Sequence, residues 1–209
     1  MVVCTGAFTH VSALNTYLSE MNANFDKDIY IIATEACTGE GAAISPPKKG
    51  VDLGNWNRGT QYSEDVIGDL NCGAVSWVDW NMVLDIDGGP NHANNTCDAP
   101  IVVDFDKQMY YKQPMYYMLA HVTRFLRPGS IRVQVQRSDN STNQIDSNVW
   151  VVAGIDATNL ASPNRTVLVI LNSDGTYSQS LKIVDPRFGY TLLTLPPHSI
   201  QTLLWDVQI

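Results

Sequence analysis

One carboxylate and two nearby tryptophans are the side chains in this sequence best suited to chemistry. Glu35 follows the apolar run of residues 29–34, and a Trp-Val-Asp-Trp-Asn segment at residues 77–81 ends the next apolar run. A carboxylate can attack the anomeric carbon of a sugar, and the face of an indole ring stacks on the apolar face of that sugar. A lone glutamate after a strand can also be a solvated loop residue, so its position in the fold has to support the assignment.

The elements that would position these residues are alternating helices and parallel strands. Apolar residues at helical spacing predict helices, and short runs rich in β-branched residues predict strands, the first of them buried on both faces. The predicted elements are a helix at 11–21, a strand at 29–34, a helix at 56–70, a strand at 74–80 and a helix at 114–125, which has proline in its first turn.

Such alternation is typical of a (β/α) barrel, in which the active site forms where the strands end. Glu35 and residues 77–81 would then share one mouth. Trp77 and Trp80 are an odd number of steps apart along the chain, so a strand of period two places them on opposite faces. At most one of the two indole rings can therefore face the mouth.

The chain changes character after residue 130. Short β-rich runs are separated there by turn signals such as Pro196-Pro197, a pattern typical of an antiparallel sandwich. The predicted strands are 132–136, 149–153, 167–171, 181–184 and 200–205. We therefore expect two domains, a partial TIM barrel at residues 1–130 and a β-sandwich at residues 131–209.

The composition and short motifs of the chain indicate which binding partners and which cellular compartments to expect. A net charge of −8 argues against nucleic acid, whose binding proteins need a basic surface, and favours an acidic compartment. No apolar run reaches the roughly 18 residues of a membrane span, and residues 1–10 do not form a signal peptide. The sequons at Asn94, Asn140 and Asn164 are candidate glycosylation sites and point to a secretory chain whose true start is missing.

Metal and cofactor chemistry is not expected. The cysteines Cys4, Cys37, Cys72 and Cys97 lack the spacing of a zinc site, and a disulfide among them stays open. No serine, histidine and aspartate combination suggests a catalytic triad. The sequence therefore predicts neither a metal nor a cofactor.

Several linked blocks carry a more specific signal. They are Thr34-Glu35-Ala36-Cys37, residues 54–63, residues 77–81, Gly88-Gly89-Pro90-Asn91 and Tyr111-Lys112-Gln113-Pro114-Met115. In order and spacing these blocks resemble the animal glucosylceramidases of glycoside hydrolase family 30. The resemblance extends from about His10 to Trp205, nearly the whole chain.

The resemblance implies a fold, an activity and site residues. The fold is α/β plus all-β, the C-terminal part of a (β/α)8 TIM barrel followed by an antiparallel β-sandwich. The activity is retaining hydrolysis of glucosylceramide at a membrane surface, in a lysosomal or secretory location, with participation of a lipid or activator protein left open. Glu35 would be the nucleophile, Trp80 would line the glucose subsite, and Asn95 would lie on a loop at the mouth.

Two further residues have a less specific role. Arg58 and Asp79 would form a supporting ion pair beneath the site, and an ordinary structural salt bridge is an equal alternative. Neither interpretation gives them a direct part in the reaction.

Two expected parts of such an enzyme are missing. A retaining glycosidase needs a second carboxylate about 5–5.5 Å from the nucleophile, and the Asn-Glu-Pro type motif of the family does not occur in this sequence. Only two barrel strands are predicted, whereas a closed barrel takes roughly 250 residues. We therefore expect a fragment, a truncated gene model or one piece of a larger enzyme, inactive by itself. The alternative hypothesis is a non-catalytic β-sandwich accessory or carbohydrate-binding module with barrel remnants.

Overall fold

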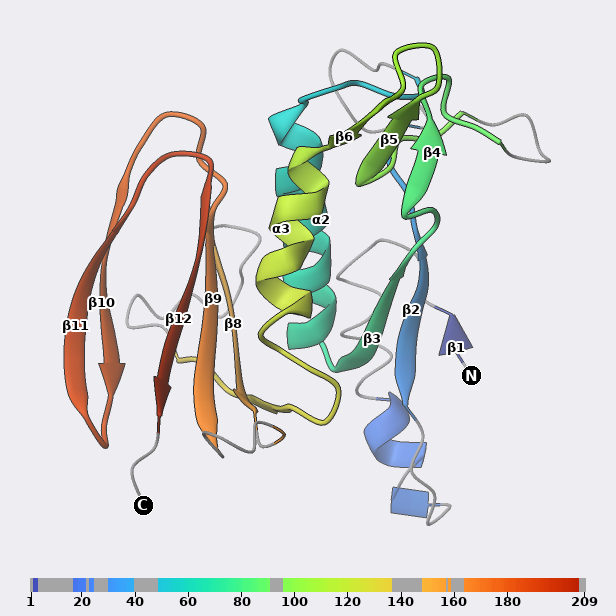
Figure 1. The fold of residues 1–209 in the computed structure, drawn as a ribbon. Coiled ribbons are helices and arrows are strands. Elements are labelled where there is room, and N and C mark those ends of the chain that lie inside the picture. Colours follow the sequence, from blue (N-terminus) through green and yellow to red (C-terminus); the bar gives the residue numbers. More distant parts are fainter. Residues whose placement is uncertain are drawn as a thin grey trace. The chain divides into compact units, whose positions relative to one another are not determined.

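The computed structural model describes residues 2–3, 17–21, 23–24, 30–39, 49–90, 96–136, 148–156, 158 and 164–206. Residue contacts divide the chain into two compact units, residues 1–119 and 120–209. Figure 1 shows parallel strands and helices in the first part of the chain and long strands in the second. This order agrees with the predicted α/β plus all-β class. The domain boundary expected after residue 130 stays a prediction.

The parallel sheet of the first unit has the strand order β1-β2-β3. β1 (Val2–Val3) and β3 (Ala74–Asp79) each pair in parallel with the central strand β2 (Ile31–Ala36). The prediction of two barrel strands therefore missed β1, because a strand of two residues gives no apolar pattern. β2 begins and ends later than predicted, so that it contains Glu35.

The burial of β2 also differs from the prediction. Ile31 and Ala33 are buried, whereas Ile32 and Thr34 are only half-buried, so the expectation of burial on both faces was wrong. Residues 17–21 are helical, in agreement with the predicted first helix. The beginning of that predicted helix, residues 11–16, lies outside the described residues.

Helix α2 (Trp56–Asn71) connects β2 to β3 and agrees with the prediction to within one residue at its end. Its first turn is capped by Asn55, whose side chain accepts a hydrogen bond from the Arg58 N–H at 3.3 Å. The helix is amphipathic, and its apolar face is buried in the first unit. Its buried apolar residues are Tyr62, Val66 and Ile67.

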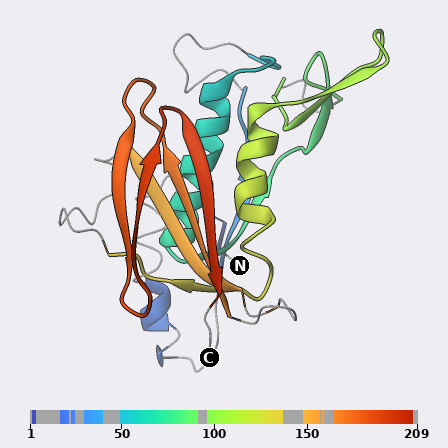
Figure 2. The ribbon, with the colours of Figure 1, turned by 60° about the vertical axis from the view of Figure 1, so that its left-hand side comes forward.

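Helix α3 (Pro114–Thr123) begins at the predicted proline and ends two residues earlier than expected. Gly59 of α2 allows a close approach of the two helices. A Cβ atom on Gly59 would lie 2.9 Å from Pro114 Cβ and 3.1 Å from Met118 Cγ. Figures 1 and 2 show α2 and α3 side by side.

A small sheet that the sequence did not predict follows β3. Its strands are β4 (Val83–Asp85), β5 (Ile101–Asp104) and β6 (Met109–Lys112), with β4 parallel and β6 antiparallel to β5. Strands of three or four residues contain too few alternations to be recognised from sequence. Leu84 packs in a buried cluster with Cys97 and Ala99, which anchors the segment before β5.

The second unit contains a four-stranded antiparallel sheet in the order β12-β9-β8-β7 and a β10-β11 hairpin. Five of its strands overlap the predicted ones. β11 was missed because most of its residues are exposed and give no buried alternation. The strands are β7 (Ile131–Val133), β8 (Val149–Asp156), β9 (Arg165–Asn172), β10 (Gln179–Asp185), β11 (Gly189–Leu195) and β12 (Ser199–Asp206).

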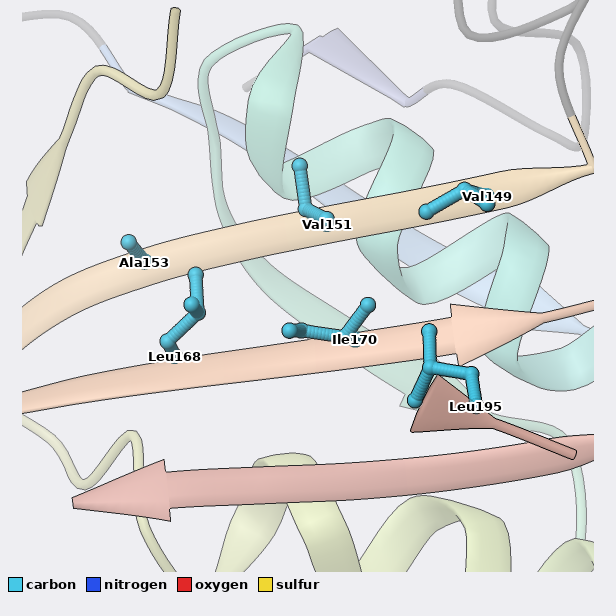
Figure 3. Packing of buried hydrophobic residues seen from close by; sticks show 6 residues of the cluster. All are labelled: Val149, Val151, Ala153, Leu168, Ile170 and Leu195. Atoms are coloured by element: carbon cyan, nitrogen blue, oxygen red, sulfur yellow. The ribbon is translucent and has the colours of Figure 1, made fainter. Parts of the chain in front are cut away.

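The core of the second unit joins the large sheet to the hairpin. Alternate residues of β8 and β9 point into it, and Leu195 at the end of β11 completes it (Figure 3). Leu181, Ile183 and Leu193 of the hairpin are partly buried against this core. The hairpin therefore covers one face of the four-stranded sheet, which is the layering of a sandwich. The β8 and β9 members of the core are Val149, Val151, Ala153, Leu168 and Ile170.

Candidate active site

The ends of β2 and β3 lie next to each other at one edge of the parallel sheet. The N–H of Trp80, the residue after β3, donates to the carbonyl oxygen of Ala36, the last residue of β2, at 2.8 Å. Glu35 is the residue before Ala36. The structure therefore brings Glu35 and the 77–81 segment to neighbouring strand ends, where barrel enzymes place their catalytic groups.

An irregularity in β2 decides the face on which Glu35 lies. The residue pairs on either side of it are Ala33 with Trp77 and Ala36 with Asp79. β2 thus has one more residue than β3 between the two pairs, and an extra residue reverses the alternation of side chains. Glu35 therefore lies on the opposite face of the sheet from Ala33, and this is the face that also carries Trp80. Both side chains are exposed, Trp80 by 38%.

The other face of β3 is turned toward α2. The indole N–H of Trp77 donates to Asp65 Oδ2 at 2.7 Å, and the Trp77 ring packs edge-to-face on Tyr62 with centroids 5.4 Å apart. The two tryptophans therefore lie on opposite faces, as their spacing predicts. Trp77 packs against the helix, and Trp80 is the indole on the face of Glu35.

Asp79 also faces α2, from the end of β3. Its carboxylate accepts a hydrogen bond from Tyr62 Oη at 2.8 Å. Burial raises the pKa of Asp79 to about 6; the hydrogen bond from Tyr62 lowers that pKa, and the charge of Asp98 adds to the rise. Burial is likewise the main cause that holds the pKa of Tyr62 far above its usual value. This pair fastens the end of β3 to the helix.

Arg58 lies on α2 with no exposed surface and forms a buried ion pair with Asp98. Its Nη1 also donates to the carbonyl oxygen of Gly50 at 2.6 Å. The structure therefore gives Arg58 and Asp79 different partners from the one predicted. Arg58 contacts Asp98, and Asp79 contacts Tyr62.

Asp98 and Gln113 are site residues that the sequence analysis missed. The amide of Gln113 donates to Asp98 Oδ1, while Gln113 Oε1 accepts from the N–H of Gly54 at 3.0 Å. The N–H of Asp52 donates to Asp98 Oδ2 at 3.2 Å. Gln113 stands in one of the blocks that carry the family resemblance, which was the available signal. Asp98 gave none, because its importance depends on a partner 40 residues away.

Of the remaining predicted residues, the structure describes only one. Asn94, Asn95 and Asn140 lie outside the described residues. Asn164 is half-buried, with φ of 67°, in the turn before β9. In the described part of the chain, no three His, Cys, Asp or Glu residues are grouped as metal ligands. None of the helices described is long and apolar enough to cross a membrane.

Comparison with known proteins gives matches over both units. The family model of the glycosyl hydrolase family 30 TIM-barrel domain matches residues 6–126, and that of the family 30 beta sandwich domain matches residues 129–203. The lysosomal acid glucosylceramidase of Mus musculus is 34% identical over 178 residues, which cover 85% of this chain and 32% of the mouse protein. The chain spans about a third of the length of the curated relatives that it matches.

Solved structures support the same architecture. SrfJ from Salmonella typhimurium aligns with a TM-score of 0.75 and 26% identity, over 96% of this chain and 38% of SrfJ. The endo-beta1,6-glucanase BT3312 aligns with a TM-score of 0.69 over 99% of this chain and 40% of its own, at 18% identity, a likeness of fold alone. The predicted fold class, part of a TIM barrel followed by a β-sandwich, is confirmed.

Proposed function

This chain belongs to glycosyl hydrolase family 30, and from that premise we propose that it carries the nucleophile of a retaining β-glycosidase. Glu35 attacks the anomeric carbon and forms a glycosyl ester, which water then hydrolyses. The observation that supports this assignment is the shared exposed face of Glu35 and Trp80 at neighbouring strand ends. One sugar ring on that face can meet the carboxylate and stack on the indole. Asn95 is proposed to lie on a loop at the same mouth.

The buried polar contacts around the strand ends have a positioning role in this proposal. Asp79 and Tyr62 fix β3 to α2, and the Arg58–Asp98 pair fixes α2 to the segment before β5. These groups lie in the interior, so they hold the strand ends without touching the sugar. A rigid support of this kind keeps a nucleophile within reach of the reacting carbon.

The acid/base carboxylate is part of the same proposal. A retaining glycosidase uses a second carboxyl group to protonate the leaving oxygen and then to activate water. The family's Asn-Glu-Pro type motif is missing from these 209 residues, and the chain matches about a third of each curated relative. We assign the acid/base to sequence outside these residues and expect the 209-residue chain to be inactive by itself.

The proposed substrate is glucosylceramide, and the proposed site of action is the lysosome or the secretory route to it. Both come from the name of the mouse relative, together with a net charge of −8 that suits an acidic compartment. Asn94, Asn140 and Asn164 are the proposed glycosylation sites. The substrate places the reaction at a membrane surface, where a lipid or an activator protein is a further proposed partner.

Labelling of the nucleophile tests the assignment. A mechanism-based fluoroglucoside forms a long-lived glycosyl ester on the attacking carboxylate. The label is expected on Glu35 in a protein that joins this chain to the N-terminal part of a family member, and peptide mapping locates it. A label on any other carboxylate would show that the assignment is wrong.

The alternative is a non-catalytic carbohydrate-binding module, and one feature of the second unit favours it. A groove of about 520 Å³ is lined by residues of β10, β11, β12 and the turn between β10 and β11, including Phe188 of that turn, Tyr190 and Trp205. Aromatic side chains in a groove are suited to sugar rings. Calorimetric binding of oligosaccharide that is lost in Tyr190→Ala, without fluoroglucoside labelling of the joined protein, would support the module and contradict the enzyme.

A further inference from the structure

Two cysteines distant in sequence meet next to the candidate active site. Cys37 follows β2, two residues after Glu35, and Cys97 lies in the segment before β5. Their Sγ atoms are 3.0 Å apart, although 60 residues separate them in the chain. A disulfide bond has an S–S length of about 2.05 Å, so the two sulfur atoms are about 1 Å from bonding distance.

The backbone around both cysteines is fitted closely. The N–H of Asp98 donates to the carbonyl oxygen of Thr38 at 2.8 Å, which joins the residues that follow the two cysteines. Gly39, at φ of 93°, leaves no space for a side chain, because a Cβ atom would lie 2.7 Å from the Asp98 nitrogen. These contacts bring the two cysteine segments together whether or not the sulfur atoms are bonded.

The exposure of the two thiols is unequal. Cys37 is exposed, whereas Cys97 is buried with 1% of its surface accessible. Cys97 also packs in the cluster with Leu84 and Ala99. An external reagent can therefore reach Cys37 first, and Cys97 can react only with a neighbour.

We propose that Cys37 and Cys97 are a reversible disulfide site that fastens the end of β2 to the segment before β5. This inference does not depend on the proposed function. The bond would tie the segment that carries Glu35 to the segment that carries Asp98, the partner of Arg58. It would also close a loop of 60 residues, which restricts the unfolded chain.

The oxidant is a low-molecular-weight disulfide such as oxidised glutathione. The thiolate of Cys37 attacks one glutathione sulfur, forms a mixed disulfide and releases one glutathione thiolate. The thiolate of Cys97 then attacks the Cys37 sulfur and expels the second glutathione thiolate. The two cysteines lose two protons and two electrons; the glutathione disulfide takes up both and becomes two glutathione molecules.

A disulfide map of the full chain tests the proposal. The reduced chain is incubated with oxidised glutathione under native conditions, its remaining thiols are alkylated, and it is digested without reductant. The expected product joins the Cys37 peptide to the Cys97 peptide, with Cys4 and Cys72 alkylated. Alkylation of both Cys37 and Cys97, or a bond from either to another cysteine, would overturn the proposal.

Oxidation in denaturant is the control for selection by the native structure. There the cysteines are expected to join in mixed pairs, because nothing brings Cys37 and Cys97 together. The natively oxidised chain is expected to unfold at a higher temperature than the reduced chain. An equal or lower unfolding temperature would contradict the fastening effect.

Single substitutions test the order of the two steps. In Cys97→Ser the glutathione adduct is expected to remain on Cys37, whereas in Cys37→Ser the buried Cys97 stays unmodified. Cys72→Ser is the matched control and keeps the Cys37–Cys97 bond. An adduct on Cys97 in Cys37→Ser, with none on Cys37 in Cys97→Ser, would refute Cys37 as the attacking thiol. The map of the unsubstituted chain decides the proposal even where a variant does not fold.

Discussion

At Glu35 the orientation of the side chain depends on one residue of strand geometry. Strict alternation along β2 would place Glu35 on the face of Ile31 and Ala33, which are buried. The extra residue between Ala33 and Ala36 turns it to the exposed face that also carries Trp80. Bulges of this kind commonly redirect a side chain next to an active site.

Replacement of the proposed nucleophile is the first prediction at this scale. Glu35→Gln, in the protein that joins this chain to a family N-terminal half, is expected to lower turnover by on the order of 10⁴-fold or more. The amide is nearly isosteric, but it cannot form the glycosyl ester. Steady-state hydrolysis of an aryl β-glucoside measures the loss, with circular dichroism to confirm an intact fold. Asp106→Asn, at an exposed turn, is the control and should retain full turnover; near-normal activity of Glu35→Gln would exclude its assigned role.

The two tryptophans should differ in the property that each substitution affects. Trp80→Ala is expected to lower kcat/KM, because the lost ring contact costs about 1–3 kcal/mol of transition-state stabilisation. Trp77→Ala is expected to lower stability instead, because Trp77 packs on Tyr62 and bonds Asp65. Kinetics and thermal unfolding on the same samples separate the two effects. Equal kinetic losses, or a larger one at Trp77, would mean that the faces of β3 are reversed.

At the scale of elements, α2 holds a buried charge network that fixes the segments around the strand ends. Arg58 and Asp98 are both buried, and Gln113 links Asp98 to the start of α3. A buried ion pair contributes little net stability compared with an apolar pair, but loss of one partner leaves an uncompensated charge. The network is therefore sensitive to single substitutions.

Asp98→Asn should reveal that sensitivity. The substitution leaves the Arg58 charge buried without its carboxylate, and we expect a loss of about 3–5 kcal/mol in the free energy of unfolding. Urea unfolding followed by tryptophan fluorescence measures it. Asp206→Asn removes the acidic partner of the exposed Arg165–Asp206 pair and is expected to cost much less. Similar losses in the two variants would argue against a buried network.

Asp69, also on α2, links stability to pH. Burial, followed by the charge of Asp65, raises the pKa of Asp69 to about 7 from an ordinary value of 3.8. The folded protein thus binds the proton more tightly than the unfolded chain, so this contribution to stability is complete below pH 3.8 and is lost as the pH rises through about 7. Asp79, with a pKa of about 6, acts in the same direction.

We therefore expect the protein to have a higher Tm at pH 5 than at pH 7.5. The Tm should fall by about 2–4 °C for each kcal/mol of unfolding free energy that is lost between the two pH values. Asp69→Asn should raise the Tm at pH 7.5 and reduce the difference, which scanning calorimetry measures. Asp104→Asn is the control, because its hydrogen bond from Lys107 lowers the pKa of Asp104. That contribution is complete at both pH values, so the control should lower both Tm values equally. A pH dependence unchanged by Asp69→Asn would contradict the assignment.

At the scale of the whole molecule, the parallel sheet has one face that the described residues leave open. Val78 on β3 and Trp80 just after it, both on the face opposite Trp77, are 44% and 38% exposed. β1 and β3 are the outer strands of the three-stranded sheet. A barrel would cover both the face and the edges with further strands.

The corresponding prediction compares the 209-residue chain with the joined protein. The chain by itself is expected to show no hydrolysis of glucosylceramide or an aryl β-glucoside at about pH 5, because loss of general acid–base assistance alone removes about 10²–10⁴-fold in rate. The joined protein is expected to be active, and Glu35→Gln in it should abolish that activity. Turnover by the chain alone that depends on Glu35 would refute the need for an external acid/base.

The sequence by itself determined the elements that have a clear local period. The amphipathic pattern located α2, the proline located the start of α3, and β-rich runs located β2, β3 and five strands of the sandwich. Linked motifs identified the family, which the family models then confirmed. These features follow from backbone preferences and side-chain spacing within about ten to twenty residues, and such information is contained in a single stretch of sequence.

The tertiary structure alone decided which residues meet. The register of β2 against β3 set the face of Glu35, burial paired Arg58 with Asp98 across 40 residues, and close backbone contact brought Cys37 to Cys97 across 60. The short strands β1, β4, β5 and β6 likewise exist only because a neighbour completes their hydrogen bonds. Partner choice of this kind depends on competition among long-range contacts in the folded chain, and no local spacing encodes its outcome.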